Sequence, residues 1–173
     1  MTSPKKALLA LAILALGACT NPDRFGDGAN DVNLNSTFDP TLNGLGDPSN
    51  PNSPAYFNQT VGDRVLFAVD TSTLTSQGET VLSQQAAWLM ANGEYNATIE
   101  GHADEQGTRE YNLNLGERRA NAVREFLISQ GVAANRISTI SYGKERPIEI
   151  CSEEACYAQN RRAVTVLGAI PTS

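Results

Sequence analysis

The order of polar and apolar positions after residue 60 predicts a regular fold of strands and helices. Runs of branched and aromatic residues, or strict alternation of apolar and polar ones, predict strands. These strands span 64–69, 96–101, 136–143 and 162–168. In the second of them Ala97 and Ile99 occupy alternate positions, and we expect both side chains to face inward.

A first helix is predicted between the first two strands. Ser76 and Glu79 have the spacing of a capping box, and Asn92-Gly93 is a typical helix end. The apolar face of this helix consists of Leu82, Ala86 and Leu89.

A second helix is predicted in the polar segment that follows residue 101. Its apolar stripe, with spacings of four, three and four, consists of Gly116, Ala120, Val123 and Leu127. Gly131 ends the helix, and Asn114 is a candidate N-cap, which would put Arg119 in the second turn. Since each residue turns about 100° around the axis, Arg119 should lie at the edge of the buried face and Arg118 should point to water.

A short helix capped by Ser152 is expected between the last two strands. The resulting order, β-α-β-α-β-(α)-β, predicts an α+β fold. We expect a two-layer sandwich with the helices on one face of a small mixed sheet.

The segment 1–18 predicts a signal peptide that is removed from the mature protein. A basic start precedes a ten-residue apolar run that is too short to span a bilayer. The run ends in Leu-Gly-Ala before Cys19, which resembles the lipobox of bacterial lipoproteins, where the thiol receives diacylglycerol. Thr20 at the next position favours the outer membrane in such proteins. The alternative is an ordinary secretory signal with an incidental cysteine.

Residues 19–54 predict a flexible tether that carries the lipidated Cys19, ahead of a domain at 55–173. Of these 36 residues, 27 are Asn, Asp, Pro, Gly, Ser or Thr, without a period in the apolar ones. Such a segment buries too little apolar surface to offset the entropy of ordering it. The alternative is that part of this segment folds when it binds a partner.

The net charge of the 173-residue chain is −6, from 13 basic and 19 acidic residues. Loss of residues 1–18 would remove Lys5 and Lys6 and leave a net charge of −8. An acidic surface without a basic stripe repels a phosphate backbone, so nucleic acid is not expected as a partner.

Asp104 and Arg119 are the candidate binding residues of the polar segment. A carboxylate and a guanidinium that are anchored separately suit a zwitterionic ligand, because one accepts from its ammonium and the other donates to its carboxylate. The alternative is that the two side chains pair only with each other.

An enzyme is not expected. A catalytic triad would need His102, the only histidine, and no G-x-S-x-G turn presents a serine. A zinc site at His102, Asp104 and Glu105 lacks further imidazoles or thiolates.

Cys151 and Cys156 are candidates for a disulfide in an oxidising compartment. A metal pair is the alternative, but the chain supplies no further cysteine apart from the one assigned to lipid.

Three segments together resemble the OmpA-like peptidoglycan-binding domain family. They are GHADEQGTREYNLNLGERRANAV (101–123), SYGKERP (141–147) and NRRAV (160–164), and the likeness covers about residues 55–170. It implies a domain without cofactor or metal that binds the diaminopimelate of the peptidoglycan stem peptide. The residues that it implies at the site are Asp104, Arg119, Asp70, Asn112, and Arg161 or Arg162.

The resemblance also implies a cellular role. Members of the family with a lipid anchor connect the outer membrane to the cell wall and support cell division. They bind the periplasmic propeller protein TolB through a surface that overlaps the peptidoglycan site. One departure concerns the first strand, where Ala68 and Val69 replace an acid and an aromatic residue of the family pattern.

Overall fold

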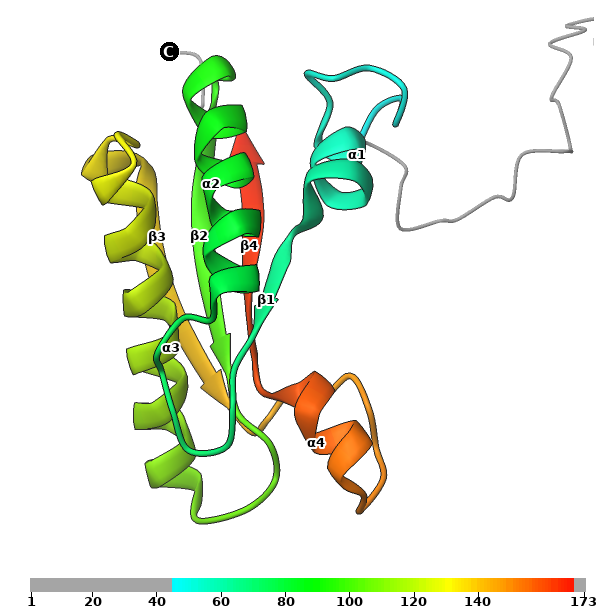
Figure 1. Cartoon of the computed structure of the whole chain (residues 1–173), viewed down its shortest axis with the longest axis vertical. Helices are drawn as coiled ribbons and strands as arrows, with labels where there is room; N and C mark the ends of the chain where they lie inside the picture. Colours follow the sequence, from blue (N-terminus) through cyan, green and yellow to red (C-terminus); the bar gives the residue numbers. More distant parts are fainter. Residues whose placement is uncertain (1–44, 170–173) are drawn as a thin grey trace, which may run out of the picture. The chain divides into compact units, whose positions relative to one another are not determined.

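The computed structural model describes residues 45–169, in which four strands and four helices follow one another along the chain (Figure 1). The strands are β1 (Arg64–Leu66), β2 (Tyr95–His102), β3 (Ile137–Gly143) and β4 (Arg162–Ala169). The helices are α1 (Pro54–Tyr56), α2 (Ser76–Ala91), α3 (Arg109–Ser129) and α4 (Glu154–Asn160). A π-helical turn (Phe57–Gly62) continues α1, and a 3-10 turn (Ala134–Arg136) precedes β3.

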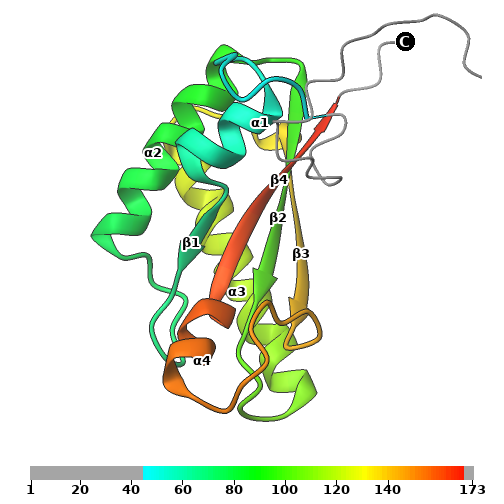
Figure 2. The same ribbon diagram turned by 90° about the vertical axis from the view of Figure 1, so that its right-hand side faces the viewer.

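The sheet has the strand order β1-β4-β2-β3 and is mixed. β2 and β3 are parallel because the long helix α3 connects them, whereas β4 is antiparallel to both β1 and β2. Helices α2 and α3 cover one face of the sheet, as Figure 2 shows with the sheet seen from its side. The predicted α+β sandwich with helices on one face is therefore confirmed.

The predicted apolar stripes form the core between the helices and the sheet. Every residue of the two predicted helix stripes is buried, and so are Ala97 and Ile99 of β2. The larger core side chains are Phe57, Phe67, Leu82, Trp88, Leu89, Ile99 and Leu127. The predicted helix ends at Asn92 and Gly131 also agree with the structure.

Gly101 and Gly116 bring β2 and α3 unusually close together. A Cβ atom on Gly101 would lie 1.8 Å from the carbonyl oxygen of Gly116, and one on Gly116 would lie 2.8 Å from that of Gly101. The stripe on α3 therefore begins with a glycine because backbone, not a side chain, packs there. This approach sets the position of the loop that follows β2.

Three predicted helix starts are wrong, because the actual caps are other residues. Thr75, not Ser76, accepts from the backbone of α2, and Thr108, not Asn114, accepts from that of α3. Helix α4 begins after Glu153, with no side-chain cap, rather than at Ser152. A polar residue caps a helix N-terminus only where its own backbone is extended. The sequence does not show which of several neighbouring polar residues has that backbone conformation.

The first strand is shorter than predicted and ends at Leu66 instead of residue 69. Phe67 still donates its backbone N–H to the Arg161 carbonyl at 2.8 Å. Beyond it the chain turns at Asp70, whose φ of 55° is incompatible with a strand.

Residues 45–54, which the prediction assigned to the tether, make hydrogen bonds with the folded domain. The Trp88 indole N–H donates to the Pro51 carbonyl at 2.7 Å, and the Ala55 N–H donates to that of Leu45 at 3.0 Å. Ser53 caps α1 through the Tyr56 N–H at 3.1 Å. A composition rich in Asn, Pro and Ser therefore conceals an ordered loop here.

The predicted signal peptide, the lipidation site Cys19 and most of the tether lie outside the described residues. Between residues 45 and 169, no helix has the length and apolar character needed to cross a membrane.

Candidate ligand-binding site

A pocket of about 260 Å³ lies where β2 leads into α3. Its walls come from the β1–α2 loop, the β2–α3 loop and the first half of α3. The lining residues are Val69, Asp70, Asp104, Gln106, Gly107, Tyr111, Asn112 and Leu115. Three of the five residues predicted to hold a ligand, Asp70, Asp104 and Asn112, thus meet in one pocket.

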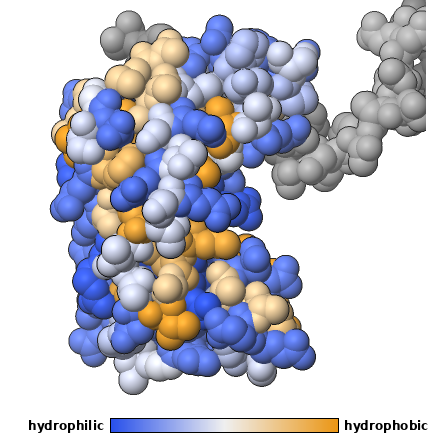
Figure 3. Space-filling view, in the orientation of Figure 1, coloured by the Kyte–Doolittle hydropathy of each residue, from blue (hydrophilic) through white to orange (hydrophobic). Residues whose placement is uncertain are grey.

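A larger pocket of about 400 Å³ lies beside β1 and the start of α2. Figure 3 shows the surface hollowed between the regions of α1 and α4, with hydrophobic side chains at the floor. Arg64 is the one charged residue among its lining residues, and none of the predicted site residues lines it. A positively charged ligand would therefore find no carboxylate in this pocket. We assign the candidate site to the smaller pocket.

Asp70 reaches the pocket through an uncommon backbone conformation. Its φ of 55° lies in the left-handed region, where aspartate is tolerated better than most residues. The hydroxyl of Tyr111 donates to its Oδ1. The turn and this hydrogen bond together direct the carboxylate towards α3.

Asp104 is the second carboxylate of the pocket, and only 8% of its surface is exposed. Oδ1 accepts the Gln106 N–H at 3.2 Å, and Oδ2 accepts from Nη1 of Arg161 at 3.2 Å. The structure has no ion pair between Asp104 and Arg119 among the described residues, so the alternative in which those two pair is wrong. The ion-pair partner of Asp104 comes from the end of α4.

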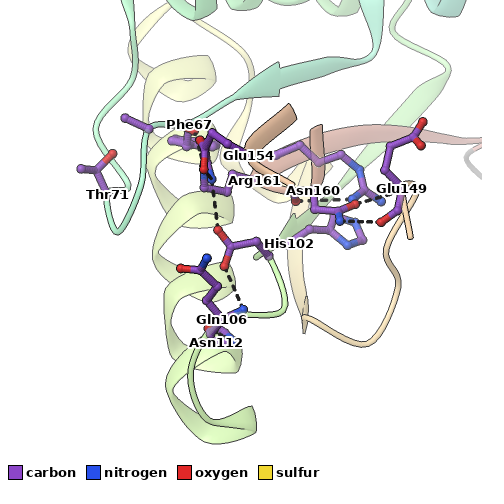
Figure 4. A network of polar contacts seen from close by, with 12 residues as sticks. Phe67, Thr71, His102, Gln106, Asn112, Glu149, Glu154, Asn160 and Arg161 are labelled. Carbon is purple, nitrogen blue, oxygen red and sulfur yellow. Dashed lines mark hydrogen bonds and ion pairs between the residues drawn. The ribbon is translucent and has the colours of Figure 1, made fainter. Parts of the chain in front are cut away.

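Arg161 lies behind Asp104 and not in the pocket wall. Its guanidinium also pairs with Glu154, and its Nε–H donates to the Phe67 carbonyl at 3.3 Å, as can be followed in Figure 4. Burial alone would lower the pKa of Arg161, but its bonds to Glu154 and Asp104 raise it, so the guanidinium stays charged. The neighbouring Arg162, the alternative from the resemblance, instead donates to the Arg146 carbonyl.

Arg119 is buried more deeply than its helical position predicts, with no exposed surface. Since α3 begins at Arg109, this residue lies in the third turn, beneath the loops. Nε, Nη1 and Nη2 donate to three backbone carbonyls, those of Thr71 (2.8 Å), His102 (2.8 Å) and Ala68 (3.1 Å). The guanidinium therefore connects the β1–α2 loop to the end of β2 without lining the pocket, while Arg118 is exposed as predicted.

The positive charge of Arg119 remains an electrostatic component of the site. Burial lowers the pKa of Arg119 to about 10, and the charges of Asp104 and Asp70 oppose this shift. The group is thus protonated at neutral pH and partly compensates the two pocket carboxylates.

Asn112 stabilises the loop that carries Asp104. The residue is buried, and its Nδ2 donates to the Gln106 carbonyl at 2.7 Å. Gln106 and Tyr111 were not predicted as site residues. Their position in the polar segment gave no signal, because their roles depend on contacts with Asp104 and Asp70.

His102 is buried on the opposite side of β2, and neither ring nitrogen has a hydrogen-bond partner within residues 45–169. Burial, followed by the charges of Arg162 and Arg146, lowers its pKa to about 4. The ring is therefore neutral at pH 7, and the contact of 3.7 Å with Glu100 is not an ion pair there. Among residues 45–169, no three His, Cys, Asp or Glu side chains are grouped so that they could hold a metal ion.

We expect His102 to make the fold sensitive to acid. Its pKa is lower in the folded state than the 6.5 of a free imidazole, so the unfolded state binds more protons between pH 6.5 and 4. The contribution is complete above pH 6.5 and is lost as the pH falls through 4, by about 2–3 kcal/mol between pH 7 and 4.5. Urea unfolding of wild type and His102→Phe at both pH values measures it, since phenylalanine does not titrate. Equal losses in the two proteins would contradict this assignment.

Cys151 and Cys156 form a disulfide with a Cα–Cα distance of 5.9 Å. Both thiols are consumed by this bond, which leaves no metal pair. The disulfide lies at the start of α4, close in the chain to Glu154.

The pocket offers two anchored carboxylates to a cation. Among the lining residues the remaining polar groups are neutral, and the arginines lie behind the wall. Such a site suits an ammonium group that belongs to a dipolar molecule.

Comparisons with known proteins agree with this fold. The sequence profile of the OmpA family matches residues 66–161. The chain is 45% identical over 163 residues to a peptidoglycan-associated lipoprotein of Agrobacterium fabrum, covering 94% of this chain and 87% of the relative. It is 46% identical over 161 residues to that of Brucella melitensis, covering 93% and 90%.

Solved structures give the same result. The crystal structure of the peptidoglycan-associated lipoprotein from Burkholderia pseudomallei matches with a TM-score of 0.62 and 40% identity, over 70% of this chain and all of that one. The C-terminal domain of Helicobacter pylori MotB matches with a TM-score of 0.59 at 20% identity, over 62% and 85%, and shows the fold alone. The names of the similar lipoproteins agree with the expectation of a protein that is not an enzyme.

Proposed function

The chain belongs to the OmpA family, and from this premise we propose that it is a cell-envelope lipoprotein that binds peptidoglycan without a covalent bond. The names of its relatives support this function at the level of a peptidoglycan-associated lipoprotein. The ligand in the proposal is the diaminopimelate of the stem peptide, whose free end is zwitterionic.

The observation that carries the proposal is the pair of carboxylates in one pocket. Asp70 and Asp104 come from different loops, and each already has a donor that orients it, Tyr111 and Arg161 respectively. A ligand ammonium between them would gain charge-assisted hydrogen bonds without first ordering the side chains.

Asn112 and the two arginines have supporting roles in this proposal. Asn112 orients the loop of Asp104 through Gln106. Arg161 and Arg119 place positive charge behind the pocket, which favours the carboxylate end of the same zwitterion. A direct contact of that carboxylate with Arg119 would require the guanidinium to leave the carbonyls of Ala68 and Thr71, so we assign Arg119 a positioning role.

The cellular part of the proposal rests on the N-terminal sequence and on the family resemblance. Lipid on Cys19 would anchor the protein in the outer membrane with the domain facing the periplasm. TolB would compete with peptidoglycan for the domain within the Tol–Pal system, which acts in envelope integrity and cell division. Many weak contacts with one polymer would hold the two layers together by multivalency.

Binding to isolated sacculi tests the proposal. We expect Asp104→Asn to weaken binding about 10- to 100-fold, because it removes a charged hydrogen-bond acceptor while keeping the shape of the side chain. The measurement is co-sedimentation of the full-length protein in detergent with diaminopimelate-type sacculi stripped of protein.

Glu125→Gln is the matched control, since it removes the same charge from an exposed position of α3. It should bind like the wild type. If Asp104→Asn also binds like the wild type, the wall is bound elsewhere. If the wild type stays in solution, the domain serves a protein partner instead.

A further inference from the structure

The Cys151–Cys156 disulfide is connected to the candidate site through a short series of ionic contacts. Glu154 lies within the loop that this disulfide closes, and its carboxylate pairs with Arg161. Arg161 in turn pairs with Asp104 in the pocket wall. The series therefore runs from the disulfide to the carboxylate proposed to bind the ligand.

Helix α4 depends on contacts outside itself for its order. It has seven residues, and Glu153 at its N-cap makes no side-chain hydrogen bond. Helices this short are unstable in isolation. Its C-terminal end is fixed by Asn160, which bonds the backbone of Ile148 and Glu149 at 2.8–3.2 Å (Figure 4). Its N-terminal end is fixed by the disulfide.

Glu154 is the member of the series that the disulfide controls most directly. Its side chain is 67% exposed, whereas that of Arg161 is 6% exposed. An exposed ion pair contributes little unless the backbone already presents its partner in the correct place. Closure of the loop by Cys151 and Cys156 supplies that condition for Glu154.

Arg161 is shared between two carboxylates, and this sharing links Glu154 to the ligand. Nη1 lies 3.2 Å from Asp104 and 3.5 Å from Glu154, and Nη2 also donates to Glu154. If Glu154 withdraws, the whole positive charge of Arg161 is available to Asp104. Asp104 is then more completely neutralised and attracts a ligand ammonium less strongly.

We propose that Glu154 is a positioning residue for the Asp104 pocket and that the Cys151–Cys156 disulfide controls it, so that reduction weakens binding. This inference rests on the proposed function. A dithiol reductant would donate two electrons and two protons, which breaks the S–S bond, forms two thiols and leaves the reductant as a disulfide.

The surroundings of the disulfide permit such a reaction. Residues 152–155 are exposed, and both cysteines are half-buried. A pocket of about 330 Å³ opens at Cys151 and is also lined by Glu105, the neighbour of Asp104 in the chain. A small reductant can therefore approach the bond.

The test compares oxidised and reduced full-length protein in detergent, titrated with sacculi in the absence and presence of dithiothreitol. We expect reduction to lower the affinity about 5-fold or more, within the usual range of coupling between two sites. Cys151→Ser/Cys156→Ser should bind like the reduced wild type and should not respond to dithiothreitol. Circular dichroism of each sample shows whether the fold persists; if the double variant unfolds, the reduced wild type carries the comparison.

Glu154→Gln separates the proposed contacts from a general loosening of α4. This variant should bind sacculi as weakly as the reduced wild type, and its affinity should fall little further on reduction. Glu153→Gln is its matched control, because this neighbouring acid makes no ion pair in the described part of the chain. It should bind and respond like the wild type.

The outcomes are distinct for the two proposals. Equal, measurable affinity of the oxidised and reduced protein would overturn the redox inference and leave peptidoglycan binding intact. Unchanged binding by Glu154→Gln would remove Glu154 from the series. Absence of binding by the oxidised wild type would overturn both the proposed function and the inference.

Discussion

Replacement of Arg119 by alanine is expected to lower the free energy of unfolding by about 3–5 kcal/mol. The variant loses three hydrogen bonds at once, and the carbonyls of Ala68, Thr71 and His102 lose a donor at buried or half-buried positions. The missing side chain also leaves a cavity beneath both loops of the pocket. We expect the loops to become disordered before the rest of the domain unfolds.

Urea unfolding followed by circular dichroism measures this loss. Arg118→Ala is the matched control, because the neighbouring arginine is exposed, and its effect should stay within about 0.5 kcal/mol. Arg119→Lys should fall between wild type and Arg119→Ala, since one ammonium cannot reach three separated carbonyls with the geometry of the guanidinium. A loss below about 1 kcal/mol for Arg119→Ala would show that these bonds are not important for stability.

Replacement of Gly101 by alanine should destabilise the protein by about 3 kcal/mol or more. Its new Cβ atom would lie 1.8 Å from the carbonyl oxygen of Gly116 and 3.2 Å from the Cβ of Ala120. The obstacle is helix backbone, so no rotation of a side chain relieves it. α3 would have to move away from β2, and the loop of Asp104 would move with it.

Gly168→Ala provides the comparison for this effect. Gly168 lies in β4, in the same sheet, and a Cβ there would meet no atom within 4 Å. Thermal unfolding should show a large decrease in the stability of the folded state for Gly101→Ala. For Gly168→Ala the free energy of unfolding should change by no more than about 0.5 kcal/mol. Similar melting temperatures for both would show that β2 and α3 adapt to the extra atom.

These two effects show how closely the candidate site depends on the core. The close contact of β2 with α3 sets the start of one loop. Arg119 in the middle of α3 bonds carbonyls of the other loop and that of His102 at the end of β2. A variant of Arg119 can therefore lose ligand binding through a change in the pocket walls. For this reason Asp104→Asn, and not Arg119→Ala, is the informative test of ligand contact.

The elements whose signals are local were predictable from the order of residues alone. The stripe of Gly116, Ala120, Val123 and Leu127 requires only the helical period, and the alternation of Ala97 and Ile99 requires only that of a strand. These periods place one face of each element in the core whatever the rest of the chain does. The fold class and the family resemblance follow from the same segments in order.

Three residues of the candidate site were predictable from the sequence, but their contacts were not. Asp70, Asp104 and Asn112 do share a pocket, as the resemblance implied. Tertiary structure alone decided that Asp104 pairs with Arg161, which is 57 residues away, and that Arg119 bonds backbone carbonyls. Several acids and arginines compete for each polar partner, and the choice among them depends on which loop ends the folded sheet brings together. Helical period can indicate that Arg119 points towards the core, but the groups that it meets there belong to other parts of the chain.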